Sequence, residues 1–347
     1  FNFIGGIISD KYNIRRILFF LSFLIFIILI YLGYLDYSGV VQPYHVYVCS
    51  ILLGILLGID FPARNAYFPK IIPEKYLRSG ISLNGATMAG SSVVVPTIGG
   101  FLIAEYGSFI GILLSAIGYL VMSISTFFIP SVSIPKDNSS NLSFFTEGFS
   151  YVVKNELFYC LILLTYCTNF FIFGYIQALP AFIDVFNGTP RELGLMFSCA
   201  GLGALSGLLT AGKVNINKNL GAIILSSASF FSVLIILVSL VGVGIMPTYV
   251  PFTNILLIFP LATIGHFGNG FYMLSTYAVI QSKVPENIRG RVMGIVAIHI
   301  SIGVLGGLWV GGIGEIFNMR VGVGSGPIIC IILIIYLIHR ILKLLPK

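Results

Sequence analysis

The sequence predicts an all-α polytopic membrane protein. Three observations predict it: the chain is long, strongly apolar and poor in charge. Of its 347 residues, 57% are hydrophobic and only 9% are charged, and the mean hydropathy is +1.01. A soluble domain carries about 25% charged residues. Because so few polar groups cannot cover a water-facing surface, we expect the apolar segments to lie in a bilayer as helices.

Ten apolar runs are long enough to cross a membrane. A hydrocarbon core of about 30 Å requires roughly 20 apolar residues in a helix. Residues 1–8 look like the end of a preceding run, and the chain begins at Phe1 inside it, without an initiator methionine. We therefore expect this sequence to be truncated at its N-terminus and to lack the first two helices of its parent. The ten complete runs are 17–35, 44–67, 81–103, 109–129, 157–178, 193–211, 220–241, 252–280, 292–313 and 323–342.

Basic residues gather in alternate loops. The loops on one side of the membrane are basic, and the first of them carries Lys11, Arg15 and Arg16. The loops on the other side carry only Arg191 and Arg320. The positive-inside rule makes the basic side cytoplasmic and predicts that both ends of the chain are cytoplasmic. The net charge of +7 then reflects membrane topology, and we expect no nucleic-acid partner. The five cysteines lie inside apolar runs without a Cys-x-x-Cys pair, so neither disulfides nor a metal site are predicted.

An internal repeat divides the chain. Residues 72–78 (Ile-Pro-Glu-Lys-Tyr-Leu-Arg) are similar to residues 284–289 (Val-Pro-Glu-Asn-Ile-Arg), and both segments join one apolar run to the next. Parallel repeats of this kind are typical of transporters built from two related halves. We therefore expect an N-terminal bundle over 1–130, a polar cytoplasmic linker over 131–156 and a C-terminal bundle over 157–347.

The polar hinge at the start of the chain matches a known motif. Gly6, Asp10, Lys11, Arg15 and Arg16 lie between two apolar runs. Their spacing resembles the loop between the second and third helices of the major facilitator superfamily. This resemblance implies the major facilitator fold, two pseudo-symmetric six-helix bundles, of which ten complete transmembrane helices are present here.

Three further motifs extend the resemblance along the chain. Gly90 with Pro96, Gly99 and Gly100 is similar to the fifth-helix packing motif of proton-coupled exporters in that family. Asp60-Phe61-Pro62-Ala63-Arg64, and Val284-Pro285-Glu286 followed by Arg289-Gly290-Arg291, resemble the subgroup of bacterial siderophore and macrolide exporters.

The charged loops are candidate gates. In the family, the acid corresponding to Asp10 meets the helix start near Arg291 and closes the inner face; a solvated loop acid is the alternative. Glu74 and Arg78 are four residues apart, and Glu286 and Arg289 are three apart, so each can pair along one helix face. Both are interpreted as gating and anchoring pairs, with an ordinary solvated surface as the alternative.

One charged pair lies at membrane depth. Asp60 and Arg64 are four residues apart within a span, where a charge costs about 2.5–3.5 kcal/mol on insertion scales and usually finds a partner. They are a structural ion pair, or Asp60 takes part in proton coupling.

Five uncharged polar or titratable residues are candidates for substrate or proton binding. The family resemblance implies that the first and fourth helices of each half line a cavity. Those of the second half carry Asn169, Gln177, His266, Asn269 and Tyr272. An imidazole titrates near physiological pH, so His266 is a proton site, a substrate hydrogen-bonding group, or a packing residue. Glycines at 201, 203, 207, 303, 306 and 307 are interpreted as close helix contacts.

These observations predict a secondary active transporter that works by alternating access. We expect proton-coupled efflux of an amphipathic, siderophore- or drug-like molecule by a monomer in the bacterial inner membrane. The proton gradient supplies the energy, no cofactor is expected, and the partners are the small-molecule substrate and the bilayer. A same-fold importer is the first alternative. An intramembrane enzyme is the second, but it requires clustered acids or a nucleophile with its base, and neither pattern is found.

Overall fold

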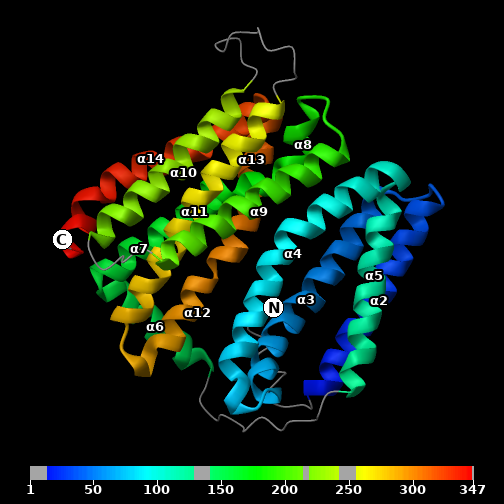
Figure 1. The fold of residues 1–347 in the computed structure, drawn as a ribbon, viewed down its shortest axis with the longest axis horizontal. Coiled ribbons are helices and arrows are strands. Elements are labelled where there is room, and N and C mark those ends of the chain that lie inside the picture. Colours follow the sequence, from blue (N-terminus) through cyan, green and yellow to red (C-terminus); the bar gives the residue numbers. More distant parts are fainter. Residues whose placement is uncertain (1–13, 129–140, 214–218, 242–254, 346–347) are drawn as a thin grey trace. The chain divides into compact units, whose positions relative to one another are not determined.

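The computed structural model describes residues 14–128, 141–213, 219–241 and 255–345. Throughout these ranges the regular secondary structure is helical (Figure 1). This agrees with the predicted class, because an apolar chain in a bilayer must satisfy its backbone hydrogen bonds within each segment.

The chain divides into two compact units. One comprises Phe1–Gly90 and Phe101–Asn141, and the other comprises Ser91–Gly100 and Leu142–Lys347. The first unit contains helices α2 (Ile14–Tyr37), α3 (Pro43–Ile71), the short η1 (Glu74–Tyr76), most of α4 (Leu77–Tyr106), α5 (Ser108–Ser125) and the short η2 (Thr126–Phe128). The second contains α6 (Asn141–Lys154), α7 (Glu156–Cys167), η3 (Thr168–Ile172), η4 (Phe173–Ala178), α8 (Leu179–Asp184), α9 (Pro190–Lys213), α10 (Leu220–Leu240), α11 (Ile255–Lys283), α12 (Glu286–Ala297), α13 (His299–Ile316) and α14 (Met319–Leu344).

Nine spans within the described ranges are long and apolar enough to cross a membrane. The predicted run 81–103 is the exception: it corresponds to α4, whose apolar stretch Val93–Tyr106 is shorter because the first half of the helix carries many polar residues. The count of ten complete spans therefore stays a prediction, whereas the helical, multi-span class is confirmed.

Helix starts follow local sequence signals. Asn155 caps α7, because its side-chain oxygen accepts hydrogen bonds from the amides of Leu157 at 3.2 Å and Phe158 at 3.5 Å. Asn318 caps α14 in the same way through the amide of Val321, at 2.9 Å. Such caps satisfy amides that have no partner inside the helix. The helix α6 begins at Asn141, within the linker predicted over 131–156.

Glycines set the close contacts between α9 and α11 in the second unit. A methyl group added at Gly203 would collide with the carbonyl oxygen of Thr263, and one added at Gly207 would collide with that of Phe267. Gly270 of α11 meets the carbonyl of Ala204 equally closely. These two helices run side by side (Figure 1, green and yellow). The predicted packing role of Gly203 and Gly207 is confirmed, since small residues let helix backbones approach in a membrane.

Candidate functional site

The first span of the second unit is interrupted near its middle. The span Glu156–Asp184 was predicted as one helix over 157–178, but it consists of α7, the π-helical turn η3, the 3₁₀ segment η4 and the short α8. The predicted apolar run is therefore one span, but its changes of helix type were not predicted. π-Turns are rare and occur frequently at functional sites, and interrupted spans form binding sites in secondary transporters.

Glycines on two neighbouring helices pack closely against the interrupted segment. A methyl group at Gly306 of α13 would collide with the carbonyl oxygen of Phe170, and one at Gly326 of α14 would collide with that of Phe171. Gly174 of η4 meets the backbone of Gly306 just as closely. The interruption is thus held by backbone contacts that exclude even one methyl group, and this confirms the predicted packing role of Gly306.

Hydrogen bonds bring Asn169 and Tyr272 together through Thr165. The Thr165 hydroxyl donates to the carbonyl of Leu161 at 2.8 Å, so the Tyr272 hydroxyl, 3.1 Å away, donates to Thr165. The Asn169 amide nitrogen donates to the Thr165 carbonyl at 2.9 Å. Two candidates that lie on α11 and on the π-turn therefore belong to one polar cluster inside the bundle.

His266 lies in an aromatic enclosure beside this interruption. Its side chain is only 1% exposed. The ring centroids of Phe231, Tyr175 and Phe173 are 5.2, 5.9 and 6.3 Å from the imidazole centroid. Nδ1 lies 2.9 Å from the carbonyl oxygen of Ala262. Because a carbonyl can only accept, Nδ1 carries the hydrogen, and Nε2 is the lone-pair nitrogen.

Two polar atoms in this enclosure lack hydrogen-bond partners among the residues that the structure describes. They are Nε2 of His266 and the hydroxyl of Tyr175. A buried polar atom without a partner costs about 1–3 kcal/mol, so each such atom in a folded protein requires an explanation, which a catalytic or proton-binding role or a bound water can supply. The enclosure therefore offers one proton acceptor and one proton donor on neighbouring rings.

The other two cavity candidates are placed differently. Asn269 is buried on α11, three residues from His266. Gln177 is exposed on η4, and its Cβ approaches Gly307 of α13 so closely that a side chain at Gly307 would not fit.

In the first unit, Asp60 and Arg64 form an ion pair, as their spacing predicted. Arg64 Nε donates to Asp60 Oδ2 at 2.6 Å, and Arg64 Nη2 donates to Oδ1 at 2.9 Å. Nη2 also lies 2.8 Å from the hydroxyl of Ser22 on α2, to which it donates. The Asp60 side chain is 7% exposed and that of Arg64 is 30% exposed. Both carboxylate oxygens are therefore engaged in a partly buried pair that links α3 to α2.

We expect Asp60→Asn to destabilise the first unit. Removing one partner of a buried pair costs about 3–5 kcal/mol, and the partial exposure of Arg64 reduces this to about 1–3 kcal/mol. A double-mutant cycle with Arg64→Gln, read by chemical denaturation in detergent, measures the coupling free energy. Additive effects of the two substitutions would show that the pair contributes nothing.

Only some of the candidate gating residues lie within the described part of the chain. Gly6, Asp10 and Lys11 lie outside the described residues, as do the side chains of Glu74, Arg78 and Glu286. Arg16 is exposed in the first turn of α2, whereas Arg15 of that turn donates to the carbonyl of Phe127. The gating roles therefore stay predictions.

Arg291 has a partner that sequence reasoning missed. Its guanidinium pairs with the carboxylate of Glu147 on the linker helix α6, and a methyl group at Gly148 would press against the Cβ of Arg291. Arg289 donates to the carbonyl of Val284 at 3.4 Å, five residues earlier in the chain. Glu147 lies 144 residues from Arg291, so no local spacing indicates the contact.

The packing motif of α4 is divided by the boundary between the units. Gly90 belongs to the first unit, and Pro96, Gly99 and Gly100 belong to the segment that groups with the second. Pro96 lies inside the helix, which continues through it to Tyr106. Its role stays a prediction.

Comparison with known proteins gives the family. The model of the Major Facilitator Superfamily matches residues 1–308. The enterobactin exporter EntS of Shigella boydii serotype 18 (strain CDC 3083-94 / BS512) is 23% identical over 320 residues, which cover 91% of this chain and 73% of the relative. EntS of Escherichia coli O81 (strain ED1a) is 22% identical over the same shares.

Solved structures show the same fold. A bacterial homologue of the iron transporter ferroportin superposes with a TM-score of 0.66 at 13% identity, covering 99% of this chain and 88% of the other. A bacterial homologue of the human lysosomal transporter Spinster superposes with a TM-score of 0.60 at 14% identity, covering 99% and 86%. With its apolar spans and this family match, the chain is a multi-pass membrane transporter that belongs to the major facilitator superfamily.

Proposed function

We propose that this transporter exports an amphipathic, aromatic small molecule in exchange for protons, with His266 as the group that takes up the proton. One observation carries the proposal: Nε2 of His266 is buried and has no hydrogen-bond partner in the described part of the chain. Because Nδ1 already donates to Ala262, Nε2 is the atom on which an incoming proton would settle.

The position of His266 suits coupling between a proton and the interrupted span. Its ring packs against Phe173 and Tyr175 of the 3₁₀ segment. A charge on the imidazole would be costly in this aromatic enclosure. Protonation therefore favours a conformation in which the segment moves and water or another partner reaches the ring. A ligand can shift a conformational equilibrium only when it binds the two states differently, and a proton on a buried ring meets that condition.

The second unit also favours an uncharged, partly aromatic substrate. Asn169 and Gln177 on η3 and η4, and Asn269 and Tyr272 on α11, are polar without net charge, and η3 and η4 are rich in phenylalanine. Enterobactin exporters are among the relatives, which supports a siderophore-like substrate and a bacterial inner-membrane location. The protein works as a monomer by alternating access in this proposal.

Asp60 takes a structural role instead. Both of its oxygens accept hydrogen bonds from Arg64, so protonation would have to break the ion pair that holds α3 to Ser22 of α2.

A transport assay tests the direction and the coupling. We expect proteoliposomes containing the protein to take up external enterobactin faster when the lumen is more acidic than the medium, because protons leave as substrate enters. Uptake that is instead accelerated by an acidic medium indicates a proton-driven importer, the alternative function. Uptake that is indifferent to either gradient contradicts proton coupling altogether. Empty liposomes under the same gradients are the control for passive partition.

A further inference from the structure

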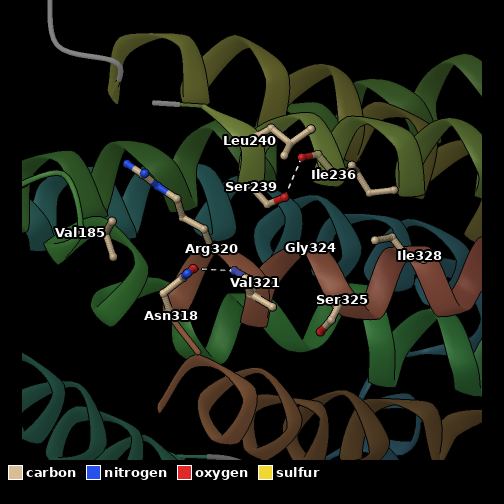
Figure 2. A pocket seen from close by; sticks show the side chains of 10 residues that line it. All are labelled: Val185, Ile236, Ser239, Leu240, Asn318, Arg320, Val321, Gly324, Ser325 and Ile328. Atoms are coloured by element: carbon tan, nitrogen blue, oxygen red, sulfur yellow. Dashed lines mark hydrogen bonds between the residues drawn. The ribbon is translucent and has the colours of Figure 1, made fainter. Parts of the chain in front are cut away.

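A groove at one end of α14 has no role in the proposed transport reaction. It has a volume of about 660 Å³ and lies among α8, α10 and the first turns of α14 (Figure 2). Its walls include Val185, Ile236, Leu240, Val321 and Ile328. Arg320 lies at one end and Ile328 toward the other, as Figure 2 shows. The groove is therefore an apolar channel with a cation at one end.

The smaller polar groups of the groove are engaged within the protein. The Ser239 hydroxyl donates to the carbonyl of Ile236 at 2.7 Å. The Ser325 hydroxyl donates to Gly322 at 3.0 Å and accepts from the indole nitrogen of Trp309 at 3.1 Å. These bonds leave the body of the groove apolar in character, which disfavours a sugar or another highly polar occupant.

The charged end has two sources of positive potential. Arg320 is in the first turn of α14, and the start of a helix carries about half a positive charge. Its guanidinium carbon lies 5.0 Å from the centroid of the Phe186 ring, which positions the side chain at the end of the groove. An anionic group would be attracted to this end.

The apolar walls are open to the surroundings of the second unit. Leu240, Val321 and Ile328 are 40%, 42% and 51% exposed. In a membrane protein such exposed apolar side chains on the spans meet acyl chains. The charge pattern of the loops predicts that Arg320 lies at the outer membrane surface, at the depth of lipid headgroups.

We propose that this groove binds an anionic phospholipid, with the phosphate at Arg320 and an acyl chain along α10 and α14. The occupant has one anionic end and a long apolar body, and the groove has one cationic end and apolar walls in the same order. Basic pockets between membrane helices on the cytoplasmic side bind anionic headgroups, and we expect the same attraction between a guanidinium and a phosphate at the outer surface. The inference goes beyond the transport reaction and does not depend on its direction or substrate.

The single tryptophan of the chain reports on the groove. Trp309 donates to Ser325, which lines the groove, so its fluorescence is sensitive to a quencher bound there. The protein is reconstituted with phosphatidylglycerol or phosphatidylcholine that carries bromine atoms on the acyl chains. We expect the brominated phosphatidylglycerol to quench Trp309 at about fivefold lower mole fraction, the preference that one basic residue gives an anionic lipid.

Matched variants test whether the preference for phosphatidylglycerol depends on Arg320. Arg320→Gln should abolish the preference for phosphatidylglycerol. Arg340→Gln is the control, because Arg340 lies at the other end of α14 and also stacks on an aromatic ring, that of Tyr336 at 5.2 Å; this variant should keep the preference. Val321→Phe should narrow the groove and reduce quenching by both lipids. Circular dichroism verifies that each variant keeps its helical content.

Four results would overturn the proposal. Equal quenching by the two lipids in the unmodified protein denies headgroup selectivity. A preference for phosphatidylglycerol that persists in Arg320→Gln contradicts the placement of the phosphate at Arg320. An equal loss of the preference in Arg340→Gln contradicts it as well. Undiminished quenching of Trp309 in a folded Val321→Phe variant contradicts the placement of the acyl chain in the groove.

Discussion

Replacing His266 by glutamine is expected to remove the proposed dependence of transport on the proton gradient. Glutamine keeps a polar side chain of similar length on α11 but cannot become charged at any physiological pH. Coupling free energies between two sites are typically 1–3 kcal/mol, a change in affinity of about 5–150-fold. We therefore expect the ratio of uptake with the gradient to uptake without it to fall toward one in this variant. The measurement compares enterobactin uptake into proteoliposomes with an acidic lumen and with no gradient.

His299 provides a matched control for this substitution. It is also a buried histidine, 6% exposed, with Nδ1 bonded to the carbonyl of Val296 at 2.7 Å. Its ring lies beside Tyr277, with centroids 6.0 Å apart. We expect His299→Gln to leave the gradient dependence intact, even where it lowers stability. Equal loss of coupling in both variants, or unchanged coupling in His266→Gln, would refute the assignment of the proton to His266.

Adding a single methyl group at Gly306 should destabilise the second unit. The Cβ of Gly306→Ala would collide with the backbone carbonyl of Phe170, and a backbone atom cannot move aside as a side-chain end can. Overfilling a well-packed core costs about 1–3 kcal/mol, and we expect a value near the upper end. Chemical denaturation in detergent, followed by circular dichroism, gives the change in the free energy of unfolding.

Gly311 of the same helix is the control for this substitution. A Cβ at Gly311 meets no atom within 4 Å among the described residues, so Gly311→Ala removes only the flexibility of glycine. That change is expected to be neutral or to stabilise the helix by up to about 1 kcal/mol. If the two variants unfold alike, the contact between α13 and the interrupted span is looser than the structure indicates.

The sequence predicted the helices well where their limits depend on local composition. Apolar runs at 17–35 and 220–241 correspond to α2 (Ile14–Tyr37) and α10 (Leu220–Leu240). The pairing of Asp60 with Arg64 was also predictable, because residues four apart meet on one helix face whatever surrounds the helix.

The interruption of the first span in the second unit was not predictable in this way. Residues 157–178 contain no proline, and their apolar run indicates a continuous helix. The break is sustained by Gly306 and Gly326, which lie more than 130 positions later and admit the backbone carbonyls of Phe170 and Phe171. Contacts between distant segments have no local sequence pattern, since any of several helices can supply the small residue.

By itself, the sequence determined the membrane class, the approximate helix limits and the family, because length, hydropathy and motif spacing are properties of contiguous residues. Only the tertiary structure decided that Thr165 joins Asn169 to Tyr272, that Glu147 is the partner of Arg291, and that Nε2 of His266 is left without a partner in the described part of the fold. These properties depend on which side chains from separate helices share one small volume, and packing alone sets that.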